Sequence, residues 1–122
     1  MEIAIDTSTR YASIVFANDG KIQSQSSWYS QQNHTVELAP YVAGLVASNK
    51  WTLTELQAVF VAKGPGGFSA LRVGMSFAKG LAESLDVPLI GVSTLHAEAL
   101  PYLRNNSSVC PIIMVGRNQF AY

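Results

Sequence analysis

The spacing of apolar residues changes several times along the chain, and each change marks a new predicted element. Apolar runs and alternating patterns predict strands over residues 2–6, 11–16, 22–29, 58–62, 87–92 and 109–115. Helical spacing predicts helices over residues 35–47, 69–85 and 94–102. Residues 58–62 and 87–92 are apolar throughout, so we expect both to be buried strands. Residues 22–29 carry few apolar side chains, which favours a place at a sheet edge.

Three hairpin-linked strands followed by alternating helices and strands predict a mixed sheet covered by helices. This order is the pattern of a ribonuclease-H-like lobe, the α/β fold that forms half of each actin-like ATPase, with a mixed five-stranded sheet and flanking helices. The length of 122 residues fits one domain. No linker or internal repeat divides the chain, so we expect residues 1–122 to form a single domain.

A glycine-rich turn joins the strand 58–62 to the helix 69–85. Gly64, Gly66 and Gly67 predict a tight turn, in which Gly64 and Gly66 take backbone angles closed to other residues. Ser69 is the expected N-cap of the helix. A Walker phosphate loop is excluded because the chain holds no Gly-Lys-Ser/Thr, and Ser69 stands where a dinucleotide fingerprint needs its third glycine. The favoured interpretation is a structural turn without a ligand.

The helices 35–47 and 69–85 are apolar on more than one side. In the second helix, Leu71, Met75 and Leu85 are expected to face the sheet, which leaves other apolar residues for a second surface. Small residues allow another backbone to come close. We therefore expect a homodimer in which two such helix pairs form a four-helix layer. The expected interface residues are Leu38, Tyr41, Val42, Leu45, Val73, Gly74, Phe77, Gly80 and Leu81.

Charge is scarce and balanced in this chain. Charged residues make up 13%, with eight basic and eight acidic side chains. No Lys/Arg cluster occurs, so the chain alone is a poor candidate for tight nucleic-acid binding. No apolar run reaches the roughly 20 residues that span a bilayer, so no membrane association is expected. The lone cysteine, Cys110, is expected to be a buried inert thiol and fits a reducing compartment, which indicates a cytoplasmic protein.

Polar residues Asp6, Thr7, Ser8 and Thr9 follow the first strand. In actin-like ATPases this turn reads Asp-x-Gly and gives phosphate access to the backbone. Ser8 replaces that glycine here, and its side chain narrows the approach. Two interpretations remain open: a vestigial phosphate turn, or a turn that Asp6 and Thr9 simply cap and tie together.

The histidines give no readable metal site. His34 and His96 lie in different elements, and neither has a histidine partner one helical turn away. His34 with Glu37 is interpreted as the start of a helix rather than as half of a site. No nucleophile–base pair can be placed either. The residues therefore predict no catalytic centre, no metal and no cofactor held by this chain alone.

Five segments resemble the bacterial TsaB (YeaZ) family, in the family's order and spacing. They are residues 3–9 (IAIDTST), 33–40 (NHTVELAP), 62–74 (AKGPGGFSALRVG), 78–82 (AKGLA) and 91–95 (GVSTL). The resemblance covers nearly the whole chain and implies the first lobe of a family whose members carry a second, smaller lobe. At residues 115–117 the chain reads Val-Gly-Arg where the family usually reads Asp-Ala-Arg.

The resemblance implies a non-catalytic, actin-like-fold subunit of the machinery that makes threonylcarbamoyladenosine at position 37 of tRNA. Family members homodimerise, or pair through the same helices with TsaD, the catalytic paralogue that carries a two-histidine metal motif. A TsaE-type ATPase is a further implied partner. The alternative is an ATP-binding enzyme lobe that transfers a phosphoryl or carbamoyl group, with ATP bound in complex with a partner. Ser8 in place of glycine and the missing metal pair favour the non-catalytic subunit.

Overall fold

The main sheet of the computed structural model, which describes residues 1–105 and 108–122, has five strands. They are β1 (Glu2–Asp6), β2 (Tyr11–Asn18), β3 (Lys21–Tyr29), β4 (Ala58–Ala62) and β5 (Leu89–Val92). Their order is β3-β2-β1-β4-β5. The β1–β2 and β2–β3 pairs are antiparallel, whereas β1–β4 and β4–β5 are parallel. The predicted mixed five-stranded sheet is confirmed, with β3 at an edge.

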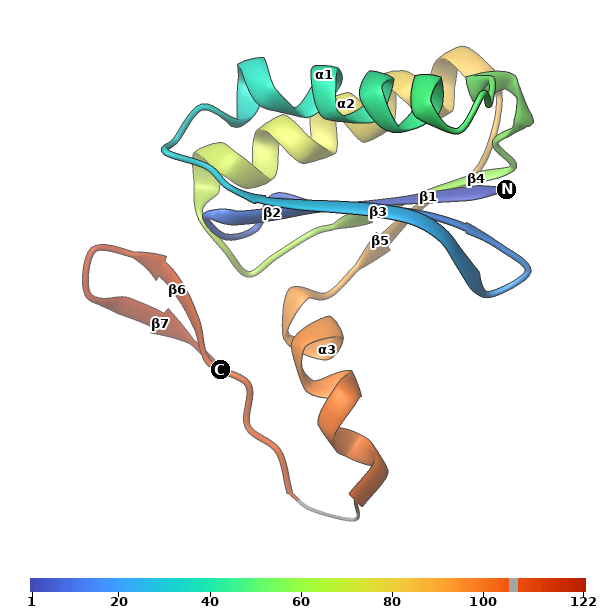
Figure 1. The fold of residues 1–122 in the computed structure, drawn as a ribbon. Coiled ribbons are helices and arrows are strands. Elements are labelled where there is room, and N and C mark those ends of the chain that lie inside the picture. The colour runs from blue at the N-terminus through green and yellow to red at the C-terminus, as the bar shows by residue number, and fades with distance from the viewer. Residues whose placement is uncertain (106–107) are drawn as a thin grey trace.

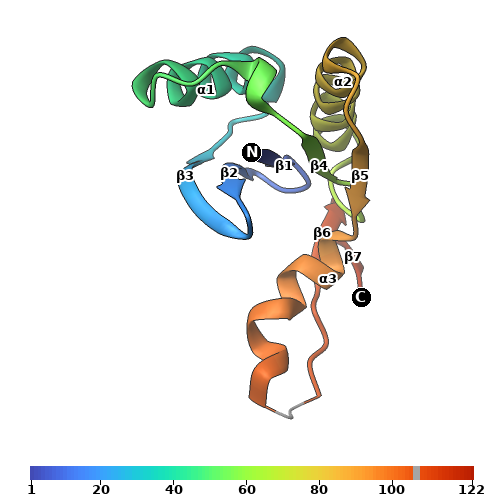
Figure 2. The same ribbon diagram turned by 90° about the vertical axis from the view of Figure 1, so that its right-hand side faces the viewer.

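Two long helices lie on the same face of this sheet (Figures 1 and 2). They are α1 (His34–Ser48) and α2 (Phe68–Leu85). The remaining elements are η1 (Leu53–Glu55), α3 (Thr94–Ala99), η2 (Leu100–Asn105), β6 (Ile113–Gly116) and β7 (Gln119–Ala121). The last four extend away from the sheet on the side opposite α1 and α2 (Figures 1 and 2). Within the described residues, no helix has both the length and the apolar character needed to cross a membrane.

The core fills the space between the sheet and the two helices. Alternate residues of a strand point to one face, and the alternate apolar residues of β1, β2 and β4 point toward α1 and α2. Bulky side chains come from the sheet and from α1, while α2 contributes alanines. The buried core residues are Ile3, Ile5, Ala12, Ile14, Phe16, Trp28, Leu38, Val42, Leu56, Val59, Val61, Ala78 and Ala82.

The inward side of α2 differs from the predicted one. Gly74, Ala78 and Ala82 are its buried residues, spaced four apart. Met75, which was expected to face the sheet, is 42% exposed. The small residues let α2 lie close to the strands, so its larger side chains flank the contact. Phe77 is among those that pack partly against the core.

Three predictions near the end of the chain were wrong. The strand predicted at 87–92 is shorter, and Leu89 and Ile90 are exposed because β5 is an edge strand. The last predicted strand, 109–115, does not join the main sheet: β6 starts only at Ile113 and pairs with β7 alone. Cys110 precedes β6 and is exposed rather than buried.

The third helix was predicted to reach residue 102. It is α-helical to Ala99 and continues as the 3₁₀ helix η2, which contains Pro101. Proline has no backbone N–H to donate to an α-helical bond, which accounts for the change. The loop predicted after this helix falls partly on residues 106–107, which lie outside the described part of the chain.

Candidate functional site

The turn after β1 is tied by its own polar side chains. The Ser8 N–H donates to Asp6 Oδ1 at 2.8 Å, and the Tyr11 N–H donates to Thr9 Oγ1 at 3.1 Å. Thr7 Oγ1 donates to the Ala70 carbonyl of α2 at 2.7 Å. Asp6 and Thr9 therefore cap and tie this turn, as one of the two interpretations predicted, while a vestigial phosphate turn stays a prediction.

The glycine turn before α2 packs directly on the turn after β1. Gly64 has φ +98°, as predicted, but Gly66 has no positive φ. Gly66 is needed for space instead: a Cβ there would lie 2.8 Å from Ser8 Cβ and 2.9 Å from Ser8 Cα. The Gly67 N–H donates to the Ser8 carbonyl at 2.8 Å, which joins the two turns.

The start of α2 also differs from the prediction. The helix begins at Phe68 with Gly67 as its N-cap, and the Leu71 N–H closes the first turn on the Gly67 carbonyl at 2.9 Å. Ser69 is exposed within this first turn and caps nothing, because Gly67 already occupies the cap position. No side chain of the described residues caps the helix, so its first-turn N–H groups stay free of protein acceptors.

A cavity of about 980 Å³ lies where these turns meet the start of α1 and the β6–β7 hairpin. Two arginines and a histidine line it, and no aspartate or glutamate does. Sequence reasoning missed both arginines, since Arg10 and Arg117 come from segments far apart in the chain. The lining residues are Ser8, Thr9, Arg10, Tyr11, Tyr29, Gln32, His34, Thr35, Gly67, Phe68, Ser69, Ala70, Val73, Met114, Val115, Gly116 and Arg117.

Arg10 and Tyr29 are held together on one wall of this cavity. Arg10 Nη1 donates to the Tyr29 hydroxyl at 3.1 Å, and this hydrogen bond raises the pKa of the Arg10 guanidinium. Tyr11 meets the Tyr29 ring edge-on with centroids 5.1 Å apart. The wall therefore presents a fixed cation beside two aromatic rings.

His34 and Glu37 do not converge on a metal. His34 is buried at the start of α1, with Nε2 3.2 Å from the Thr9 carbonyl oxygen. Glu37 instead accepts a 2.9 Å bond from the Trp28 indole, and hydrogen bonds from Ser30 and Trp28 lower the pKa of its carboxyl. Within residues 1–105 and 108–122, no three His, Cys, Asp or Glu side chains gather closely enough for a metal.

The residues predicted for a partner interface divide into two groups. Leu38 and Val42 are buried in the core of their own chain, and Gly74 is buried because its α-carbon packs on the Thr7 side chain. These three face inward and are not on the surface. The exposed or half-buried residues are Tyr41, Leu45, Val73, Phe77, Gly80 and Leu81, and their role in an interface stays a prediction.

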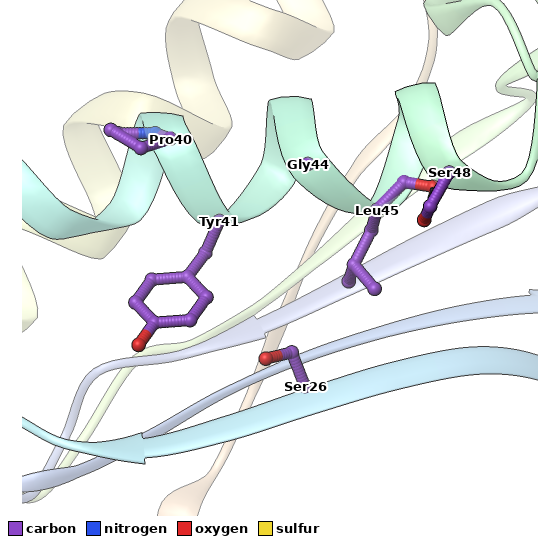
Figure 3. A pocket seen from close by; sticks show the side chains of 6 residues that line it. All are labelled: Ser26, Pro40, Tyr41, Gly44, Leu45 and Ser48. Carbon is purple, nitrogen blue, oxygen red and sulfur yellow. Dashed lines mark hydrogen bonds between the residues drawn. The ribbon is translucent and has the colours of Figure 1, made fainter.

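A small hollow of about 310 Å³ runs along the outer edge of α1 above β3 (Figure 3). It is lined by Ser26, Pro40, Tyr41, Gly44, Leu45 and Ser48. Tyr41 stacks on Trp28 with ring centroids 3.9 Å apart and an interplanar angle of 10°. The stack fixes α1 to β3, and the small side chains beside it leave the hollow open.

The solvent side of α1 carries no charge. Glu37 is the one charged residue of this 15-residue helix, and it is bound to Trp28. Val36 is 69% exposed. The exposed residues of the helix are Thr35, Val36, Ala39, Pro40, Tyr41, Ala43, Gly44, Ala47 and Ser48. We define these nine residues as the outer face of α1.

The fold and its surfaces define an actin-like, ribonuclease-H-like lobe. The sequence model of the family described as TsaD, tRNA N6-adenosine threonylcarbamoyltransferase, matches residues 26–122. The chain is 34% identical over 106 residues to the tRNA threonylcarbamoyladenosine biosynthesis protein TsaB of Escherichia coli, covering 87% of this chain and 46% of that protein. It is 32% identical over 117 residues to TsaB of Bacillus subtilis, covering 96% and 51%.

Solved structures give the same relationship. YeaZ from Pseudomonas aeruginosa matches with a TM-score of 0.78 at 28% identity, covering 86% of this chain and 49% of that one. The chain belongs to the TsaB (YeaZ) family, as its sequence motifs indicated. It spans about half the length of the relatives it matches.

Proposed function

We propose that this chain is a non-catalytic subunit in the formation of threonylcarbamoyladenosine at position 37 of tRNA, and that it docks a TsaD-type partner through the outer face of α1 and the adjacent α2. The names of the TsaB relatives support the pathway. The family model described as the threonylcarbamoyltransferase TsaD supports a paralogue as the partner. Two chains of one fold can present matching helix pairs to each other.

The observation that carries the proposal is the uncharged outer face of α1. Solvent-facing helix surfaces normally carry charged residues, whereas this face has nine exposed residues without any charge. Exposed apolar surfaces of this kind mark interaction sites. The face lies beside α2 on the same side of the sheet, which supports docking across both helices (Figure 2).

Two glycines inside the helices support a close approach of another backbone. A Cβ on Gly44 of α1 or Gly80 of α2 would meet no atom of the chain within 4 Å. Glycine inside a helix costs about 0.5–1 kcal/mol relative to alanine. The isolated fold gains nothing from either glycine, so both fit a contact made outside the chain.

The described residues also support a role without catalysis. They hold no cluster of potential metal ligands, and the net charge of zero gives little attraction for tRNA. We therefore assign tRNA binding and the chemistry to partner subunits, with a TsaE-type ATPase among them, and place the chain in the cytoplasm with no cofactor of its own.

The docking proposal is tested by placing a charge on the outer face of α1. Ala43→Glu adds a carboxylate at an exposed position and removes no core contact. Calorimetric titration with the TsaD-type protein of the same organism should show Kd weakened about tenfold or more, because the charge would be desolvated in the interface. The matched control is Gln25→Glu on the opposite face of the sheet, which should leave Kd unchanged.

Equal affinity of the Ala43→Glu variant and the unmodified chain would overturn docking through this face. The pathway is tested separately in cells depleted of their own TsaB. The chain should restore threonylcarbamoyladenosine in tRNA, measured by mass spectrometry of nucleosides. Intact docking without restored modification would overturn the role in the pathway and leave the interface standing.

A further inference from the structure

The cavity beside the β6–β7 hairpin lies at the starts of α1 and α2, whereas Ala43 lies further along α1. We propose that this cavity binds an acidic peptide segment of a partner protein, with Arg10 and Arg117 pairing to its carboxylates. The inference goes beyond the proposed function, because it concerns a second surface that recognises its partner by charge. Thr35 is the one residue shared by this cavity and the outer face of α1.

The walls of the cavity are positively charged, although the chain has eight basic and eight acidic residues. Arg10 lies in the turn between β1 and β2, Arg117 lies in the turn between β6 and β7, and both line the cavity. The Arg72 guanidinium carbon lies 5.4 Å from the ring centroid of Phe68, which also lines it. Three of the four arginines of the chain therefore gather at one cavity, and no aspartate or glutamate lines it.

Neither wall arginine is neutralised by the chain itself. Arg10 and Arg117 form no salt bridge within residues 1–105 and 108–122. Two carboxylates come from neighbouring segments, but Asp6 caps the turn after β1 and Glu37 accepts a hydrogen bond from an indole. Neither of these carboxylates lines the cavity. The positive walls therefore complement carboxylates supplied from outside, and such complementarity determines which partners a surface accepts.

Arg10 is held in place before any partner binds. Arg10 Nη1 donates to the Tyr29 hydroxyl at 3.1 Å, and the Arg10 carbonyl accepts from the Ser30 N–H at 2.7 Å. A guanidinium has five N–H donors, so other donors remain for a carboxylate, which binds arginine through two parallel hydrogen bonds. An oriented side chain loses less conformational entropy on binding. Arg10 is therefore the expected anchor for an acidic side chain.

Large apolar surface lies beside the two arginines. Tyr11 is 71% exposed, Phe68 is 73% exposed and Met114 is 62% exposed, and all three line the cavity. Aromatic residues, methionine and arginine are enriched at protein interfaces, whereas lysine is depleted, and no lysine lines this cavity. A peptide in which acidic residues alternate with apolar ones would contact both kinds of wall. A small inorganic anion would leave the apolar wall exposed.

Size and charge favour a peptide over a nucleic acid. The cavity of about 980 Å³ has room for a few peptide residues, since sites for small molecules span about 300–1,000 Å³. A nucleic acid is bound through many phosphates, which basic groups of the protein must neutralise. Two wall arginines on a chain of zero net charge provide few such groups. The expected occupant is therefore a short acidic segment of a protein.

The probe is a synthetic peptide with blocked termini and the sequence Glu-Phe-Glu-Leu-Glu. It is titrated at low salt into the isotope-labelled full chain while amide spectra are recorded. The amide signals of Tyr11, Phe68 and Arg117 should shift with saturation. The matched peptide Gln-Phe-Gln-Leu-Gln should bind about tenfold or more weakly, because neutral hydrogen bonds replace charge-assisted ones.

Substitution of either wall arginine tests the charge pairs from the side of the protein. Arg10→Gln and Arg117→Gln should each weaken binding of the glutamate peptide about tenfold, because each removes one guanidinium–carboxylate pair. The matched control is Lys21→Gln on β3, which changes the net charge equally but does not line the cavity. It should leave the binding unchanged. The melting temperature of each variant checks that it is folded.

Three results would overturn the proposal: no amide shift at millimolar peptide, equal affinity for the glutamate and glutamine peptides, or tighter binding of a uridine hexanucleotide than of the glutamate peptide. The last result would assign the cavity to a nucleic acid instead. Ala43→Glu should not change the peptide titration, so failure here is distinguishable from failure of the docking proposal.

Discussion

At the scale of single residues, Gly66 and Gly80 have different physical roles. A Cβ at Gly66 would collide with Ser8, whereas a Cβ at Gly80 would meet nothing within 4 Å. Gly66→Ala should therefore lower the free energy of unfolding by about 1–3 kcal/mol. Gly80→Ala should raise it by about 0.5–1 kcal/mol, because alanine favours the helix. Denaturant unfolding measures both changes in the Ala43→Glu background, in which no second copy is expected to cover the helices.

A stable Gly66→Ala variant would show that the two turns do not need their close contact. Loss of stability in Gly80→Ala would show that α2 already has a close neighbour at that point in the isolated chain. Either outcome would contradict the assignment of Gly66 to the fold and of Gly80 to a contact outside it.

Sequence reasoning found the turn residues but not always their physical role. Gly64 takes the positive φ that the pattern predicted. Gly66 was assigned the same role, yet it is required because Ser8 approaches from the turn after β1. The serine at 69 matched the preference for capping residues, but the N-cap is Gly67, two residues earlier, whose N–H binds the Ser8 carbonyl. Both errors come from a contact between segments far apart in the sequence.

At the scale of elements, the contact between α1 and β3 predicts a pH effect. Hydrogen bonds from Ser30 and Trp28 lower the pKa of Glu37 from its ordinary value of 4.5. The ionised carboxylate therefore stabilises the fold above that value, and this contribution is lost as pH falls through the lower folded pKa. Glu37→Gln keeps an acceptor for Trp28 but removes the charge. Its melting temperature should fall below that of the unmodified chain at neutral pH, and the difference should shrink as pH falls below 4.5 and through the lower folded pKa.

The matched control for this prediction is Glu83→Gln on α2. Glu83 forms an exposed pair with Lys79 at 3.7 Å, and such pairs contribute little to stability. Its melting temperature should follow that of the unmodified chain at every pH. A constant difference between Glu37→Gln and the unmodified chain from pH 3 to 7 would contradict the assigned role of the Glu37 charge.

The elements that sequence reasoning located best are those with the clearest periodicity. Residues 58–62 were predicted as a strand and form β4 with the same bounds. The strand at 87–92 was predicted to be buried from its composition. Instead β5 is the edge strand of the sheet and pairs only with β4.

In α2 the apolar pattern suggested that Met75 faces inward. The buried residues of α2 are instead Gly74, Ala78 and Ala82, whose small size allows close packing on the sheet. Hydrophobicity alone does not predict this, because these residues are less hydrophobic than methionine.

At the scale of the whole molecule, the last part of the chain carries an incomplete core. Of residues 94–122, Thr94, Ala99 and Ile113 are the buried ones in the described part. The large exposed apolar side chains there are Leu100, Tyr102, Leu103, Ile112, Met114, Phe120 and Tyr122. The alternation of apolar residues could predict β6 but not its partner, because strand pairing depends on which segments meet in space. Composition likewise gave no sign that Arg117 would reach the cavity beside α2.

The outer face of α1 also predicts how this chain assembles. The face is expected to be covered by a second copy when the chain is alone, in an interface of about 1,600 Å² or more, and by a TsaD-type partner when one is present. A single face can hold only one occupant, so the partner should displace the second copy and form a one-to-one complex.

Sedimentation velocity of the fluorescently labelled chain measures whether the two occupants compete for the outer face of α1. The chain should sediment as a dimer at micromolar concentration, and Ala43→Glu should sediment as a monomer with an unchanged melting temperature. Addition of the partner should convert the dimer to the one-to-one species without an intermediate of higher mass. A complex of two copies with one partner would contradict a shared face, and a monomer at all concentrations would contradict the homodimer.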